Sequence, residues 1–153
     1  MPRRTLMLCC LLPALALPSL AQASDSSLVA ALSPYKSTLT VDLILLAEVR
    51  TVPAKASIPA EAARLRKVQA DMTTVERAAR GQTPSTTTGR TAQSQALTAL
   101  GYAYTSAGDG LAAMAAALAG KAAAAKTDLA NEQAVFAKSI PPFELSGKAL
   151  GLF

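Results

Sequence analysis

Hydrophobic positions recur every three or four residues along most of the chain, which is the spacing of one face of an α-helix. The clearest example is 58–80, where a narrow apolar stripe is flanked by polar residues. The stripe consists of Ile58, Ala62, Leu65, Val68, Met72, Val75 and Ala79. Pro59 stands in the first turn and Gly81 follows the last residue, as is typical of helix ends. We therefore predict a helix over 58–80.

A second stripe predicts a helix over 28–51. Its members are Leu32, Tyr35, Leu39, Leu43, Leu46 and Val49. Ile44 and Leu45 lie off this face and widen it. A wide apolar face is typical of a helix packed on two sides inside a bundle, and this is our first interpretation. The alternative is an exposed patch for a partner, which makes Ile44 and Leu45 candidate contacts.

The pattern over 91–139 contains Gly108-Asp109-Gly110, which suits either a turn or the interior of a long helix. Large apolar residues on both sides share one heptad register, which favours a continuous helix. They are Leu97, Leu100, Tyr104, Leu111, Met114 and Leu118. Two glycines inside a helix cost about 1 kcal/mol each relative to alanine. In a turn, Gly108 would instead cap one helix and Asp109 would begin the next.

Helix length favours the turn. At 1.5 Å per residue, the first two helices would each reach roughly 35 Å, whereas an unbroken 91–139 helix would reach about 73 Å. A break gives four helices of comparable length: 28–51, 58–80, 91–107 and 110–139. We therefore predict an all-α protein, a self-contained antiparallel four-helix bundle.

The continuous helix remains as the alternative. It predicts self-association as a dimer, because half of the long helix would otherwise expose an apolar stripe. Leu111, Met114 and Leu118 would lie at that interface, and they complete our set of candidate partner contacts.

Two segments are predicted to be irregular. Residues 81–91 are rich in Gly, Pro, Ser and Thr without periodicity, which indicates a surface loop. Pro141 and Pro142 are expected to end the last helix, because proline removes a backbone donor. The tail, 140–153, would then dock on the bundle through Phe143 and Phe153.

Residues 1–23 have the layout of a secretory signal peptide. Arg3 and Arg4 precede an apolar run, and the small residues Ala21 and Ala23 follow it. The run is too short to cross a hydrocarbon core, which needs about 20 residues. We expect cleavage after Ala23, which would leave a single domain, 24–153, without a transmembrane segment. The protein would then be exported to the periplasm or to the outside of the cell.

The composition argues against several chemistries. The chain has no His or Trp, and both cysteines lie in the predicted leader, whose removal would lower the formal charge from +5 to +3. The usual general base, the thiolate nucleophile and most zinc and haem ligands are therefore missing. A carboxylate pair could be assembled by the fold from Asp42, Glu48 and Asp71, but no spacing supports it. We expect no enzymatic activity, cofactor or metal.

Two functions from different classes remain. Few aromatics and interleaved charges argue against nucleic-acid binding. The first hypothesis is an exported, alanine-rich helical protein that binds another protein or itself as an accessory factor of the cell envelope. The alternative is a protein that binds a small apolar ligand or an anionic envelope surface, including the membrane surface. In that case the anionic group would be held by Arg64, Arg66 and Lys67.

Overall fold

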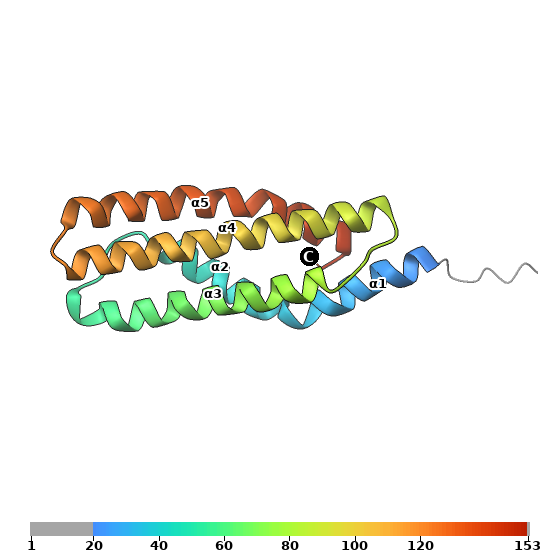
Figure 1. Ribbon diagram of the computed structural model, residues 1–153, viewed down its shortest axis with the longest axis horizontal. Helices are drawn as coiled ribbons and strands as arrows, with labels where there is room; N and C mark the ends of the chain where they lie inside the picture. The colour runs from blue at the N-terminus through green and yellow to red at the C-terminus, as the bar shows by residue number, and fades with distance from the viewer. Residues whose placement is uncertain (1–19, 153) are drawn as a thin grey trace, which may run out of the picture.

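The computed structural model describes residues 20–152, with side chains from Asp25 onward. This part of the chain is almost entirely helical and contains no strand (Figure 1). Its helices are α1 (Leu20–Leu32), α2 (Lys36–Glu48), α3 (Ile58–Arg80), α4 (Thr87–Leu118) and α5 (Ala122–Leu150). Short 3-10 turns, Ser33–Tyr35 and Lys55–Ser57, precede α2 and α3. The prediction of an all-α helical bundle is confirmed.

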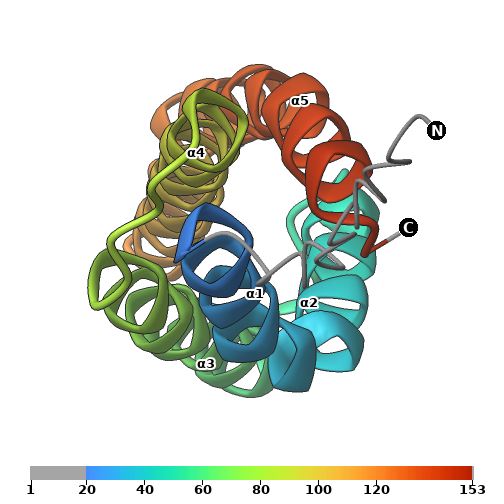
Figure 2. The same cartoon turned by 90° about the vertical axis from the view of Figure 1, so that its right-hand side faces the viewer.

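The helices form a ring around one core (Figure 2). α4 lies between α3 and α5 and packs most extensively against these two. α1 and α2 follow each other as one N-terminal arm, and α2 closes the ring by contacting both α3 and α5. The entire predicted stripe of α3 is buried, from Ile58 to Ala79. The helix over 58–80 therefore has the predicted bounds and the predicted inner face.

The predicted turn at 108–110 is wrong, because α4 runs through these residues without a break. A Cβ atom on Gly110 would lie 3.0 Å from Leu65 Cδ1 and 3.5 Å from Glu132 Cγ. One on Gly108 would lie 3.3 Å from the Gln69 amide nitrogen. These glycines therefore let α3 and α5 approach α4 closely, and the packing compensates for their low helix propensity.

The chain reverses direction at Gly120 instead, where the backbone has a φ of 71°. Lys121 N donates to Ala116 O at 2.8 Å and Gly120 N donates to Ala117 O at 3.1 Å. This pair of bonds is the Schellman motif, which ends a helix with a left-handed residue. The turn divides 87–150 into two antiparallel helices of similar length. A continuous helix through 108–110 is thus compatible with a self-contained bundle and requires no dimer.

The predicted end of the last helix at Pro141 and Pro142 is also wrong. α5 continues to Leu150 and ends at Gly151, whose φ is 65°. The prolines cannot donate to the carbonyl groups of Ala137 and Lys138, but both of these residues are exposed, where water can hydrate a carbonyl. Phe143 is buried against the bundle as expected, and Phe153 lies outside the described residues.

α4 begins at Thr87, inside the predicted loop 81–91. Thr86 caps the helix by accepting a hydrogen bond from Gly89 N at 2.9 Å. The same hydroxyl donates to the Asp25 carboxylate of α1. A Cβ atom on Gly89 would overlap Asp25 Oδ1, so any side chain there would force Asp25 to move and would disturb this contact. The start of α4 is therefore fixed by a contact with the N-terminal arm, which the local sequence does not reveal.

Most of the predicted leader, 1–19, lies outside the described residues. Ala21 and Ala23 fall in the first turn of α1, so cleavage after Ala23 would shorten that helix. By length and composition alone, the helical stretch Asp25–Glu48 could cross a membrane. Signal sequences and the core helices of soluble proteins meet the same criterion. Here the stretch packs on the bundle, with Leu28 and Leu46 in the core.

Candidate functional site

An apolar groove lies between α2 and α5. It has a volume of about 350 Å³. Its walls include Leu39, Leu43, Ile44 and Ala47 from α2 and Phe136, Ile140 and Phe143 from α5. We call it the α2–α5 groove. α2 makes few contacts with either α3 or α5, and Ile44 on its groove side remains exposed.

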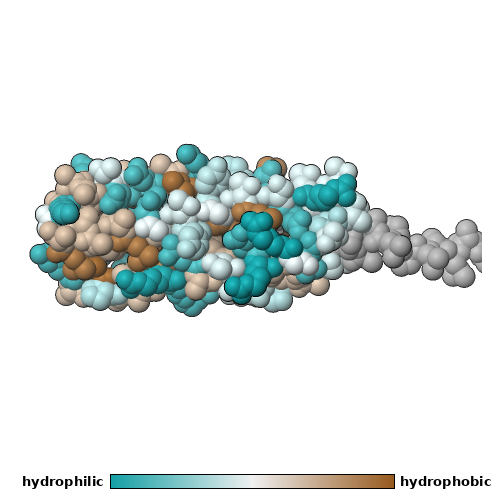
Figure 3. Space-filling model, in the orientation of Figure 1, coloured by the Kyte–Doolittle hydropathy of each residue, from teal (hydrophilic) through white to brown (hydrophobic). Residues whose placement is uncertain are grey.

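A second depression of about 630 Å³ lies at the end of the bundle that carries the α4–α5 turn. Its floor is apolar and includes Ile58, Ala125 and Leu129. Its rim carries three cations, Arg50, Lys55 and Lys126, and no carboxylate lines it. We call it the basic end. Apolar surface gathers at this end of the molecule (left in Figure 3).

The two depressions are neighbours along the bundle. A smaller hollow of about 150 Å³ lies between them. It shares Ala47 and Phe136 with the α2–α5 groove and Arg50 with the basic end. Gln133 also lines it and donates its amide across the gap to the carbonyl oxygens of Val49 and Arg50, at 3.5 and 3.4 Å. We call this row of three hollows the elongated depression; it is apolar at the α2–α5 groove, polar at Arg50 and Gln133 in the middle, and has cations at one end.

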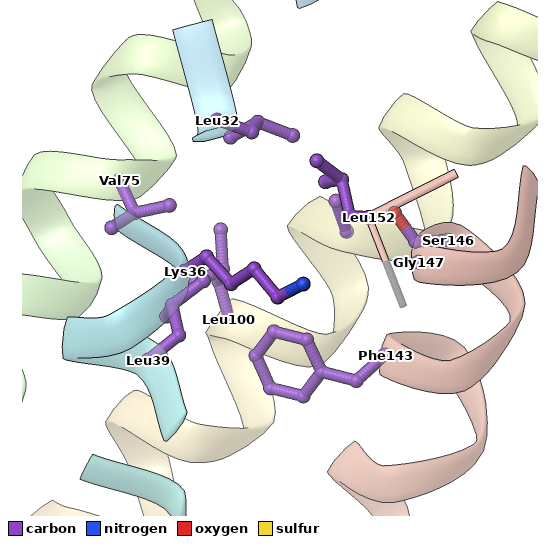
Figure 4. Close-up of a pocket in the computed structure, with 10 residues that line it drawn as sticks. Leu32, Lys36, Leu39, Val75, Leu100, Phe143, Ser146, Gly147 and Leu152 are labelled. Atoms are coloured by element: carbon purple, nitrogen blue, oxygen red, sulfur yellow. The ribbon is translucent and has the colours of Figure 1, made fainter. Parts of the chain in front are cut away.

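A separate cavity of about 40 Å³ lies near the C-terminal end of α5 (Figure 4). Leu32, Leu100, Phe143 and Leu152 surround it, with the Lys36 side chain alongside. A volume this small holds only about three waters, because each needs about 10–15 Å³ of such space. We interpret it as a packing gap and not as a ligand site.

Glu132 is a fully buried acid on the inner face of α5. Its Oε1 atom accepts a hydrogen bond from Ser106 Oγ at 2.9 Å, whereas Oε2 has no partner within the described residues. Burial raises the pKa of Glu132 to about 7, the hydrogen bond from Ser106 opposes this rise, and the charge of Asp109 adds to it. Glu132 therefore holds its proton well into the range where acids are normally ionised.

Asp42 is a second buried acid, placed between α2 and α3. The pKa of Asp42 is raised to about 6, chiefly by burial and also by the charge of the nearby Asp71 and a hydrogen bond with it. Lys67, which pairs with Asp71, has the opposite effect. The fold thus brings Asp42 and Asp71 together, whereas Glu48 is exposed. Within residues 20–152, no group of His, Cys, Asp or Glu is arranged to hold a metal ion.

The predicted contact residues are dispersed over the bundle. Ile44 lines the α2–α5 groove and is 53% exposed, and Leu45 is half-buried against the core. Leu111 is also half-buried, and Leu118 is exposed at the end of α4. Met114 is buried in the core, so it cannot contact a partner in this fold. Of the five, only Ile44 belongs to the elongated depression.

The cations predicted for an anionic group lie elsewhere. Arg64 pairs with Glu61 at 3.5 Å and Lys67 pairs with Asp71, both on the outer face of α3. Arg66 is exposed on the same helix. These residues lie away from the lining of either depression, and two of the three already have carboxylate partners.

Sequence reasoning missed the residues that face α2 from α5 and those that form the basic end. Phe136 and Ile140 were available as apolar positions one helical turn apart. Arg50, Lys55 and Lys126 come from a linker and a distant helix, and nothing in their spacing brings them together. No protein-family model, curated protein or solved structure matches this chain.

Proposed function

We propose that this protein is a non-enzymatic binding protein that receives an elongated apolar ligand in the α2–α5 groove, after export to the cell envelope. The observation that carries the proposal is the row of three adjoining hollows along α5, of which the α2–α5 groove is almost entirely apolar. Exposed apolar surface is costly to leave in water, and a concave, mostly apolar surface is typical of a binding site. The volume of the α2–α5 groove is within the range of small-molecule sites, about 300–1,000 Å³.

The leader-like segment supports the cellular part of the proposal. The arm that begins at α1 is apolar, which is compatible with a signal sequence. If the leader is removed after Ala23, the exported protein begins at Ser24, and its mass and N-terminal sequence show this directly. An exported protein with an intact N-terminus would contradict this part alone.

Filling the groove tests the binding function. Ala47 is shared by the α2–α5 groove and the middle hollow, so Ala47→Trp places a large ring across the depression. Nile red, a neutral apolar fluorophore, should bind the purified protein saturably. Ala47→Trp should weaken that binding about tenfold or more, which corresponds to at least 1.4 kcal/mol.

Ala63→Trp is the matched control, because Ala63 is an exposed alanine on α3. It adds the same ring outside the depression and should leave binding unchanged. Absence of saturable binding to the unsubstituted protein would overturn the proposal. An equal loss in both variants would show that the dye binds elsewhere.

A second candidate, binding of another protein or of a second copy, is favoured by the rim of the groove. Ile44 and Ile140, which line the groove, are 53% and 43% exposed, and Val41, also on α2, is 62% exposed. A partner protein would cover this rim as well as the groove. A photo-crosslinking side chain at Val41 should then give a defined protein adduct in cells, and the same group at Arg66 should not. Equal labelling from both positions would contradict it.

A further inference from the structure

The basic end has three cations and no carboxylate in its lining. Arg64, Lys67 and Arg80 each pair with a carboxylate on α3. In contrast, Arg50, Lys55 and Lys126 take part in no ion pair within residues 25–152. The lack of an ion pair does not by itself distinguish the basic end, because Arg66 and Arg77 also take part in none within residues 25–152. Three cations gathered over an apolar floor produce a positive potential that favours an anionic group.

The floor beneath these cations is apolar. Ile58 and Ala125 are 1% and 2% exposed, and Leu129 forms part of the same surface. A molecule that placed an acid group among the cations would therefore continue into an apolar environment. The middle hollow shares Arg50 with the basic end and shares Ala47 and Phe136 with the α2–α5 groove, so it lies between the cations and the groove.

The two ends of the depression have opposite charge. Glu144 lines the far end of the α2–α5 groove, near Phe143. Lys36, in the adjoining cavity, already has an interaction partner. An anionic group is thus attracted by the basic end and repelled by Glu144, so the charges fix the direction in which a ligand would lie.

The length of the depression suits one extended chain. Along α5, the distance from Leu129 to Phe143 is about 21 Å at 1.5 Å per residue. A hydrocarbon core about 30 Å thick contains two leaflets, so one lipid chain extends over roughly 15 Å. One such chain fits the depression with room for its polar end.

We propose that the ligand is a single-chain anionic amphiphile, a free fatty acid, whose carboxylate lies among Arg50, Lys55 and Lys126 and whose chain lies along the α2–α5 groove. This inference rests on the proposed function, which supplies the groove. It adds the chemical class of the ligand and its orientation. Arg50 lies where the basic end and the middle hollow meet, so it would contact the carboxylate most directly.

The experiment compares palmitate with hexadecanol, which has the same chain length but no charge, by displacement of Nile red from the purified protein. Palmitate should bind about tenfold tighter, because favourable interaction with three cations is worth at least 1.4 kcal/mol in total. A triple variant, Arg50→Gln, Lys55→Gln and Lys126→Gln, should remove this difference, so that palmitate and hexadecanol bind the variant with similar affinity.

A second triple variant with the same loss of charge provides the control. Arg66→Gln, Arg77→Gln and Lys138→Gln neutralise exposed cations away from the basic end. This variant should retain the preference for palmitate. A loss equal to that of the first triple would mean that net charge, and not the basic end, selects the acid, and would overturn the inference.

The remaining outcomes separate the two proposals. Equal affinity for palmitate and hexadecanol, blocked by Ala47→Trp, would overturn the fatty-acid assignment and leave the groove as a binding site. Failure of either compound to displace the dye would overturn both. Sedimentation with phosphatidylglycerol vesicles without displacement by palmitate would show that the cations meet a membrane surface, which also overturns the inference.

Discussion

Gly110 of α4 and Leu65 of α3 are in direct van der Waals apposition, because a Cβ atom on Gly110 would lie 3.0 Å from Leu65 Cδ1. Leu65 is fully buried and has little freedom to withdraw. The contact explains why a residue of low helix propensity stands in the middle of a long helix. It also gives the glycines of α4 different expected responses to substitution.

Gly110→Ala should be less favourable than Gly101→Ala by at least about 1 kcal/mol. Gly101 has nothing within 4 Å of the added atom, so alanine there should stabilise the protein by about 1 kcal/mol through helix propensity. At Gly110 the same gain is opposed by overpacking, which typically costs 1–3 kcal/mol. Urea unfolding of both variants measures the difference, and equal stabilisation would contradict the close packing of α3 on α4.

Gly120→Ala should destabilise the protein by about 1 kcal/mol, because the left-handed conformation is costly for a residue with a Cβ atom. No atom lies within 4 Å of the added group, so the cost comes from the backbone alone. Gly120→Asn provides the control, since asparagine tolerates this conformation better and should lose less. Equal thermal stability of all three proteins would argue against a turn at this position.

Glu132→Gln should flatten the pH dependence of stability between about pH 4.5 and 7. The pKa of Glu132 is raised from 4.5 to about 7 in the folded protein. Its contribution to stability is therefore fully present below pH 4.5 and is lost as the pH rises through 7. The loss is on the order of 3 kcal/mol, at 1.36 kcal/mol per pKa unit.

The measurement is the free energy of unfolding in urea from pH 4 to 8. Glutamine can still accept the Ser106 hydrogen bond, but it does not ionise. The free-energy cost of burying it therefore does not vary with pH. The free energy of unfolding of the variant should therefore increase relative to that of the parent protein as the pH rises. Parallel curves for the two proteins would mean that Glu132 does not hold its proton in the folded state.

Asp42→Asn should remove a second pH-dependent step, between about pH 3.8 and 6. Burial and Asp71 raise the pKa of Asp42 to about 6, so its stabilising contribution is present below pH 3.8 and lost as the pH passes 6. Asp71→Asn should shift this step to lower pH, because the like charge is removed. The same titration of unfolding free energy separates this step from that of Glu132, and an unchanged profile in both variants would contradict the contact.

The sequence predicted the fold class and the whole of α3, because the stripe Ile58–Ala79 follows a single face without interruption. It did not predict where α4 ends. The glycines at 108 and 110 were interpreted through local backbone preference, whereas their role depends on Leu65, Gln69 and Glu132 on neighbouring helices. The real turn at Gly120 lies in an alanine-rich segment where the hydrophobic pattern carries little information.

The candidate site was predicted only in part. Ile44 was identified because it lies off the main face of its helix, and it does line the α2–α5 groove. Met114 was chosen from the same kind of pattern, but it is buried, because an apolar stripe does not show which neighbour covers it. The cations of the basic end, Arg50, Lys55 and Lys126, are spread over 76 positions of the sequence. Only the fold brings them together.

The bond from Gln133 to the carbonyl of Val49 joins residues 84 positions apart, whereas α4 and α5 are joined by three residues, 119–121. Closing the longer loop costs more chain entropy, and local contacts form sooner in folding. The α4–α5 hairpin is therefore expected to assemble early, and the N-terminal arm to dock late. The α2–α5 groove would then come into existence at the last step of folding, and it would be the first surface lost when the arm detaches.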